Sequence, residues 1–307
     1  MIRKTIARKT VVRQTAILTL LLACSIVVNP GVTHAEEIGG IRVTPDVVYG
    51  HKFGMALTMD VLQPKETNGA GVLFMVSGGW VSRWMPARLE IAYLRPLLKH
   101  GFTVFAVRHG SSPRFKVPEA VADVRRAVRF VHMTADRWDV DPKRLGVSGF
   151  SAGGHLSLVL GTTGDDGDPK AKDPVLRHSS RVAAVVAYFP PTDLRPYVKL
   201  DSPYRKQFPA LAFDPEKATE YSPLLHVTSD DAPTLLVHGD KDTLVPLWHS
   251  EKIDQAFKEN NVPVRLLVIK DAGHGFAGAG ADRAAEAWSE WLSRHLGVKE
   301  ADAPSGE

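Results

Sequence analysis

Short apolar runs alternate with amphipathic stretches along most of the chain. The apolar runs have the length of strands that are buried on both faces, and they cover residues 72–76, 102–107, 145–148, 182–189, 234–237 and 265–269. Between them, apolar residues recur at helical spacing, as in Val121, Val124, Val128 and Val131 and in Trp288, Trp291, Leu292 and His295. The alternation predicts an α/β fold with a mostly parallel central sheet flanked by helices on both faces.

The run at residues 145–148 leads into Gly-Phe-Ser-Ala-Gly, residues 149–153, and then into an apolar stretch that fits a helix. A Gly-x-Ser-x-Gly pentapeptide between a strand and a helix is typical of a nucleophile elbow, which exposes the serine at the top of a sheet. The serine backbone is strained there, and side chains at positions 149 and 153 would collide with neighbouring elements. The sequence therefore predicts Ser151 as a nucleophile.

Two further predicted strands end in residues that complete a catalytic triad. The run 234–237 is followed by a turn with Asp240 and Asp242, and the run 265–269 is followed by His274. A serine hydroxyl is a poor nucleophile at neutral pH, so it needs a base to take its proton and an acid to orient that base. Open sheets carry their sites at the carboxyl ends of the strands, where all these residues fall.

The segments GFSAGG, HGDKDTLVP and AGHGF resemble those of α/β-hydrolase-fold serine hydrolases. They are most similar to secreted esterases related to acetyl-xylan and feruloyl esterases, and to the catalytic domains of prolyl oligopeptidase-like enzymes. The resemblance extends over about residues 41–296, and it implies an α/β-hydrolase fold that opens with antiparallel strands at 41–48 and 55–62. It also implies Asp242 as the triad acid and Asp240 as a turn residue. No cofactor or metal is expected.

The predicted strand 72–76 is followed by Ser-Gly-Gly-Trp, residues 77–80. Related esterases carry His-Gly-Gly-Gly-Trp here, so the resemblance implies that the amides of Gly78 and Gly79, with that of Ala152, form the oxyanion hole. The sequence departs from that pattern because the histidine that braces the loop and the first glycine are replaced. An ordinary glycine turn is the alternative interpretation.

Several other residues are candidates for the site. Trp80 is expected to bind substrate or to cap the core, and His109 to bind substrate, although a structural hydrogen-bonding role is favoured for it. His155 is expected to pack under the elbow, and residues 192–231 to form a lid or a substrate-binding insertion. An acidic run lacks the spacing of a calcium loop and is interpreted as a solvated turn; it contains Asp165, Asp166, Asp168 and Asp173.

The N-terminus predicts a signal peptide over residues 1–35. An apolar run at residues 16–28, too short to span a bilayer, follows a basic stretch and precedes an acceptable cleavage site after Ala35. We expect export to the periplasm or the extracellular space. Leu-Leu-Ala-Cys, residues 21–24, resembles a lipoprotein signal and leaves lipid anchoring through Cys24 as the alternative. The catalytic domain is expected over residues 40–297 and a disordered tail over residues 298–307.

Charge excludes one class of partner. The chain has 38 Lys and Arg against 34 Asp and Glu, but five of the basic residues lie in the predicted leader, which has no acid; the rest has 33 against 34 and a net charge of −1. Nucleic-acid binding is not expected without a basic face, and neither is a transmembrane segment in the mature chain. Cys24 is the only cysteine, so a cleaved product has no disulfide.

The sequence thus predicts an exported serine esterase that cleaves a small-molecule or carbohydrate ester through an acyl-enzyme. A serine oligopeptidase is the alternative, although such enzymes normally carry a large N-terminal propeller. A catalytically silent binding protein is a third hypothesis. The acyl group, the alcohol and the oligomeric state are left open.

Overall fold

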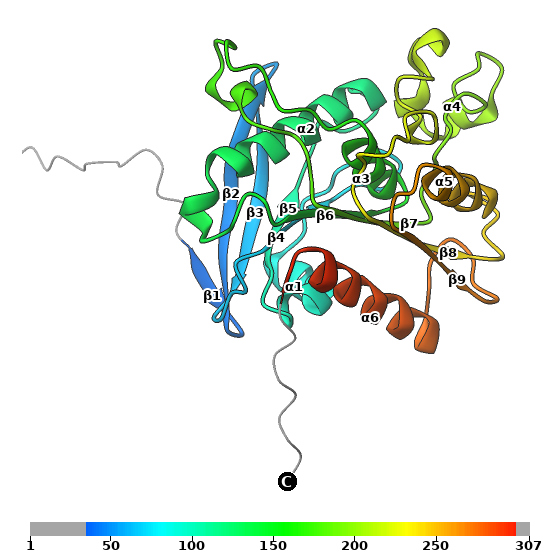
Figure 1. The fold of residues 1–307 in the computed structure, drawn as a ribbon. Coiled ribbons are helices and arrows are strands. Elements are labelled where there is room, and N and C mark those ends of the chain that lie inside the picture. Colours follow the sequence, from blue (N-terminus) through cyan, green and yellow to red (C-terminus); the bar gives the residue numbers. More distant parts are fainter. Residues whose placement is uncertain (1–34, 299–307) are drawn as a thin grey trace, which may run out of the picture. The chain divides into compact units, whose positions relative to one another are not determined.

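The computed structural model describes residues 35–298, and a nine-stranded sheet in the order β1-β2-β3-β5-β4-β6-β7-β8-β9 forms its centre (Figure 1). The strands are Glu36–Ile38 (β1), Ile41–Lys52 (β2), Met55–Pro64 (β3), Gly71–Met75 (β4), Thr103–Val107 (β5), Leu145–Phe150 (β6), Ala184–Tyr188 (β7), Thr234–Gly239 (β8) and Val264–Ile269 (β9). Strands β4 to β9 pair in parallel, whereas β1, β2 and β3 are antiparallel to their neighbours. The predicted fold class is confirmed.

The conformation of a two-residue turn explains the hairpin of β2 and β3. Strands β2 and β3 are joined by Phe53 and Gly54, whose φ angles are 47° and 78°. Two consecutive residues with positive φ give a tight hairpin turn whose twist matches that of the strands. The register then pairs Lys52 with Met55 and, at the other end, Ile41 with Pro64, so the hairpin extends well beyond the predicted strands 41–48 and 55–62.

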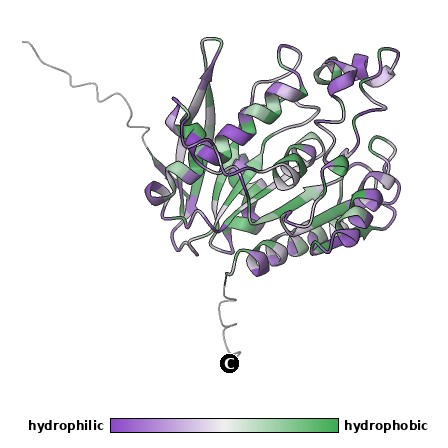
Figure 2. Ribbon diagram, turned by 45° about the horizontal axis from the view of Figure 1, so that its top comes forward, coloured by the Kyte–Doolittle hydropathy of each residue, from purple (hydrophilic) through white to green (hydrophobic). Residues whose placement is uncertain are grey.

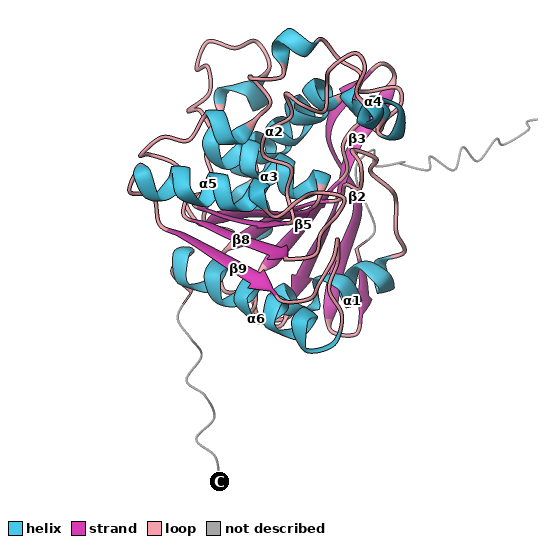
Figure 3. Ribbon diagram, turned by 90° about the vertical axis from the view of Figure 1, so that its right-hand side faces the viewer, coloured by secondary structure: helices cyan, strands magenta, loops and turns pink. Residues whose placement is uncertain are grey.

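Helices cover both faces of the sheet, as the edge-on view in Figure 3 shows. They are Ala87–Leu98 (α1), Val117–Met133 (α2), Ala152–Thr162 (α3), Pro203–Gln207 (α4), Trp248–Glu259 (α5) and Gly278–His295 (α6). Helices α2, α3 and α5 lie on one face, and α1 and α6 lie on the other (Figure 1). The layers match the prediction from alternating strands and helices.

Each face has its own hydrophobic core. The valine stripe at positions 121, 124, 128 and 131 of α2 is buried in the first, and Trp288, Trp291 and Leu292 of α6 are buried in the second. Figure 2 shows apolar residues concentrated in the strands, with polar residues on much of the helices' surface. Burial on both sides explains why the central strands read as continuous apolar runs.

This arrangement places the ends of β6, β8 and β9 at one edge of the sheet. Because these strands are parallel, the residues that follow them lie at the same end of the sheet. The segment between β7 and β8 contains α4 and three one-turn 3-10 helices. That irregular segment includes residues 192–231, which were predicted to form a lid or substrate-binding insertion.

The predicted signal peptide, Cys24 and the end of the C-terminal tail lie outside the described residues. Within residues 35–298, no helix has both the length and the apolar character needed to cross a membrane.

Candidate active site

Ser151 stands at the turn between β6 and α3 with φ 53° and ψ −116°. A Cβ on Gly149 would lie 2.5 Å from the carbonyl carbon and oxygen of Gly153, and a Cβ on Gly153 would lie 2.5 Å from the carbonyl oxygen of Met75. Neither position can hold a side chain without moving backbone. The two glycines therefore allow the elbow to pack against β4 while the serine keeps its strained conformation.

A continuous chain of hydrogen bonds joins Ser151, His274 and Asp242. The Oγ of Ser151 lies 2.9 Å from Nε2 of His274, and Nδ1 of His274 lies 2.7 Å from Oδ2 of Asp242. An ionised carboxylate can only accept, so Nδ1 carries the proton and Nε2 is free to accept from the serine hydroxyl. In this tautomer the imidazole can take the proton of Ser151 as the hydroxyl attacks.

The other carboxylate oxygen of Asp242, Oδ1, is also hydrogen-bonded. It accepts from the amides of Leu244 and Val245, each at 2.9 Å, and Nε2 of His238 lies 3.4 Å from Oδ2. Burial alone would raise the pKa of Asp242, but the hydrogen bonds from His238, His274 and the backbone outweigh it and hold that pKa well below its usual range. Asp240 is exposed. Of these two acids, Asp242 is the one whose carboxylate is bonded to His274.

The two glycines of the loop after β4 have different surroundings. The amide of Gly78 donates to the carbonyl of Val81 at 3.0 Å, and Val81 donates back. The Gly78 amide is therefore committed inside the turn, which differs from the expectation that it faces the reacting centre. Gly79 has φ 58° and borders the cavity beside Ser151. The amide of Ala152 opens helix α3, where amides begin without a partner inside the helix.

Trp80 is 5% exposed and lines the same cavity, so it packs in the core and also borders the site. Its indole Nε1 donates to Nδ1 of His155 at 3.3 Å, and Nε2 of His155 donates to the carbonyl of Tyr221 at 2.8 Å. Burial lowers the pKa of His155 to about 4. His155 therefore lies neutral under the elbow, as expected from its position one turn after the nucleophile.

His109 does not line that cavity. It is 4% exposed, and its ring nitrogens lie 2.8 Å from Oγ of Ser77 and 2.9 Å from the carbonyl of Gly110. With both nitrogens bonded inside the protein, the favoured structural role fits this geometry better than contact with a substrate.

The cavity beside Ser151 is small and almost entirely apolar, with a volume of about 30 Å³. Besides the residues already named, its walls include Leu194, Tyr197, Tyr204, Phe208 and Leu211. All five come from the segment between β7 and β8. The predicted insertion thus supplies one side of the site.

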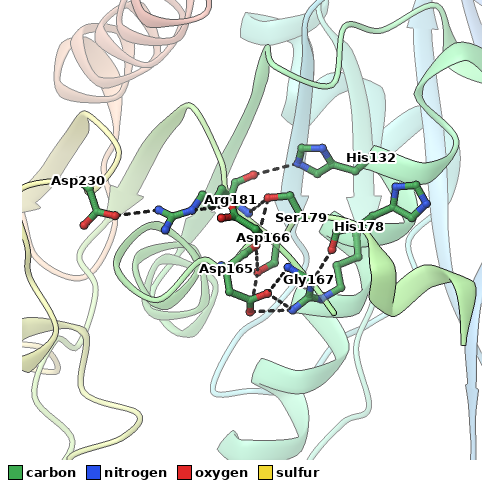
Figure 4. A network of polar contacts seen from close by, with 10 residues as sticks. His132, Asp165, Asp166, Gly167, His178, Ser179, Arg181 and Asp230 are labelled. Carbon is green, nitrogen blue, oxygen red and sulfur yellow. Dashed lines mark hydrogen bonds and ion pairs between the residues drawn. The ribbon is translucent and has the colours of Figure 1, made fainter. Parts of the chain in front are cut away.

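Three carboxylates of the acidic run at residues 165–173 form ion pairs with arginines, and Figure 4 shows those of Asp165 and Asp166. Asp165 pairs with Arg129, and Asp166 pairs with Arg181, which also reaches Asp230. Asp173 pairs with Arg126. Asp168 instead accepts from the amide of Lys170 at 2.9 Å.

The fold and the hydrogen-bonded Ser-His-Asp arrangement at a nucleophile elbow define the class as an α/β-hydrolase. The family model BD-FAE matches residues 59–257, well over half of the chain. The protein belongs to the BD-FAE family.

Several relatives of this chain are named as esterases or ester hydrolases. It is 28% identical over 258 residues to the probable carboxylic ester hydrolase LipM of Mycobacterium tuberculosis, covering 78% of this chain and 58% of LipM. The similar esterase LipC of the same organism is covered to 59%, so the chain spans somewhat over half the length of these relatives.

Solved structures show the same fold. An acetyl ester-xyloside bifunctional hydrolase from Caldicellulosiruptor lactoaceticus is 27% identical, with a TM-score of 0.69 over 81% of this chain and 91% of that one. A truncated carbohydrate esterase from gut microbiota has a TM-score of 0.71, with 24% identity over 87% of this chain and 99% of that chain.

Proposed function

We propose that this protein is a serine esterase that hydrolyses carboxylic esters through an acyl-enzyme. The observation that carries the proposal is the hydrogen-bonded chain from Ser151 through His274 to Asp242, set at a strained elbow. The esterase names of the relatives support the same reaction class.

In the first half-reaction, Oγ of Ser151 attacks the ester carbonyl carbon while Nε2 of His274 takes the hydroxyl proton. The carbonyl oxygen becomes an oxyanion, and the amides of Gly79 and Ala152 are the proposed donors to it. Each such donor typically stabilises the transition state by about 3 to 4 kcal/mol. The C–O bond then breaks, and the alcohol leaves with the proton from His274.

In the second half-reaction, water takes the place of the alcohol. His274 removes a proton from the water as it attacks the acyl carbon, and a second oxyanion forms in the same place. The intermediate collapses to release the carboxylic acid and return the proton to Ser151. Asp242 stabilises the imidazolium in both halves, and its depressed pKa keeps it ionised throughout.

The size of the cavity supports a short acyl group as the substrate. The cavity beside Ser151 is small and its walls are apolar, which suits the methyl of an acetyl group better than a long or aromatic acyl chain. The polar alcohol would then lie toward the open side of the site. The similarity to a hydrolase named for acetyl esters and xylosides supports an acetylated carbohydrate.

The place of action is also part of the proposal. The basic, apolar and small-residue pattern of residues 1–35 supports export, with cleavage after Ala35. Anchoring through Cys24 is the competing outcome. Two measurements on the wild type and the Cys24→Ala variant distinguish cleavage from anchoring: the mass of the mature protein and its distribution between membrane and soluble fractions. If the protein is lipid-anchored, the Cys24→Ala variant loses its membrane attachment.

The substrate proposal is tested with p-nitrophenyl esters of increasing acyl length, acetylated xylan, feruloylated sugars and peptide anilides. We expect kcat/KM for acetate to exceed that for octanoate by at least about tenfold, because each misplaced methylene group costs on the order of 1 kcal/mol or more. Phe208→Ala should open the cavity and shift the preference toward longer chains. Faster cleavage of peptide anilides than of any ester would favour the oligopeptidase alternative.

A further inference from the structure

The oxyanion loop has a partner on the neighbouring strand. Ser77 follows β4 and His109 follows β5, and these strands are adjacent and parallel. Their ends therefore meet at the same edge of the sheet, and Nε2 of His109 comes within 2.8 Å of Oγ of Ser77. The contact links residues that lie 32 positions apart in the chain.

The direction of this hydrogen bond follows from the other ring nitrogen. Nδ1 of His109 lies 2.9 Å from the carbonyl oxygen of Gly110, which can only accept. Nδ1 therefore carries the proton, and Nε2 accepts from the hydroxyl of Ser77. Burial lowers the pKa of His109, which favours the neutral ring that this arrangement needs.

His109 is itself held in place. The amide of Gly110 donates to Oδ2 of Asp123 at 2.9 Å, and Asp123 pairs with Lys52 at 2.7 Å. On the loop side, the hydroxyl of Ser82 donates to the carbonyl of Val76 at 2.5 Å and accepts from the amide of His109 at 3.3 Å. These contacts fix the position of the His109 imidazole, and the loop is hydrogen-bonded to it through Ser77.

The far end of the loop is fixed by different contacts. Trp80 donates to His155 through its indole, and its carbonyl accepts from the amide of Ser112 at 3.1 Å. Gly79 lies between the two fixed ends with φ 58°, a conformation that glycine tolerates, and it borders the same cavity as Ser151. Release of the Ser77 end would let the Gly79 amide move.

We propose that His109 is a positioning residue, which sets the oxyanion loop through the hydroxyl of Ser77. This rests on the proposed esterase function. The role is to place the Gly79 amide for the developing oxyanion, so its loss acts on the transition state. A misplacement of about 1 Å in such a donor costs on the order of 100-fold in rate.

The test compares His109→Leu, Ser77→Ala, the double variant and His109→Gln in the full chain. We expect His109→Leu and Ser77→Ala each to lower kcat for p-nitrophenyl acetate about 10- to 100-fold with KM within about threefold. The double variant should lose no more than the worse single variant. His109→Gln can offer an amide oxygen to Ser77 and should recover much of the rate. His51→Leu, at an exposed histidine of β2, is the matched control.

Thermal unfolding of each variant separates positioning from folding. If His109→Leu fails to fold, Ser77→Ala tests the same bond, because it removes one hydroxyl from a half-buried position. Wild-type kcat in folded Ser77→Ala, or additive losses in the double variant, would overturn the proposal.

A second readout separates this proposal from the esterase function. When a fluorophosphonate labels Ser151, its phosphoryl oxygen gains negative charge in the transition state and occupies the same hole, so its labelling rate should fall in parallel with kcat. If the wild type is labelled but hydrolyses no ester, the esterase proposal fails, and the labelling rates of the variants still decide the role of His109.

Discussion

Replacing Asp242 with asparagine tests the order of the triad with little change in shape. The carboxylate has two distinct sides: Oδ1 accepts from the amides of Leu244 and Val245, and Oδ2 accepts from Nδ1 of His274. In the variant, the amide oxygen can keep the two backbone bonds only if the amide nitrogen takes the place of Oδ2. A donor then faces Nδ1 of His274.

The consequence is a change of tautomer. Nδ1 must accept, the proton moves to Nε2, and Nε2 can no longer take the proton of Ser151. The same change in another serine hydrolase lowers kcat about 10⁴-fold, which corresponds to about 5.5 kcal/mol of transition-state stabilisation. We expect a loss of this order in Asp242→Asn.

The assay is the steady-state hydrolysis of p-nitrophenyl acetate, in which kcat should fall while KM stays close to that of the wild type. Asp240→Asn is the matched control, because Asp240 is exposed in the same turn; its kcat should stay within about twofold of wild type. Asp242→Asn with more than about a tenth of the wild-type kcat, or a larger loss in Asp240→Asn, would refute the assignment of the acid.

Three other predictions concern the nucleophile, the elbow and a buried acid. Ser151→Ala should lower ester turnover by several orders of magnitude while the thermal unfolding curve stays cooperative. Mass spectrometry should then find no fluorophosphonate adduct at residue 151. Gly153→Ala should destabilise the protein by about 1 to 3 kcal/mol or prevent folding, because the new Cβ meets the carbonyl oxygen of Met75 at 2.5 Å; Gly161→Ala in the same helix meets only a valine side chain and should lower Tm less. Burial, and then the charge of Asp60, raises the pKa of Glu90 to about 8; its stabilising contribution is therefore full below the unfolded pKa near 4.5 and is lost as pH rises through about 8. Glu90→Gln should flatten the fall of Tm between those pH values, and an unchanged pH dependence would contradict the assignment.

The sequence predicts most of the fold because its central parallel strands, β4 to β8, are buried on both faces. Each of the runs 145–148, 234–237 and 265–269 lies within a strand of the sheet, and each is followed by the residue that joins the hydrogen-bonded chain. The strand ends were less predictable. Hydrogen bonding continues through polar and glycine residues, as in β8, which extends to Gly239.

The less predictable part of the site depends on contacts between strands. Nothing near Ser77 in the sequence indicates His109, because their contact requires β4 and β5 to be neighbours, and the hydrophobic pattern carries no information on strand order. The amide of Gly78 is a similar case: its bond to Val81 depends on a local turn that the two glycines permit but do not specify. Residue types indicated the chemistry, whereas tertiary contacts decide which amide remains available.

One wall of the cavity and the reacting groups come from separate parts of the chain. Ser151, Asp242 and His274 stand on the ends of sheet strands, while one side of the cavity is made by a single stretch between β7 and β8. Mutations in that stretch can change which acyl group fits without altering the strands that hold the triad. Substitutions within this one segment can therefore change the substrate range of the enzyme during evolution. A chimaera that exchanges residues 192–231 with those of a relative would transfer the acyl preference of that relative.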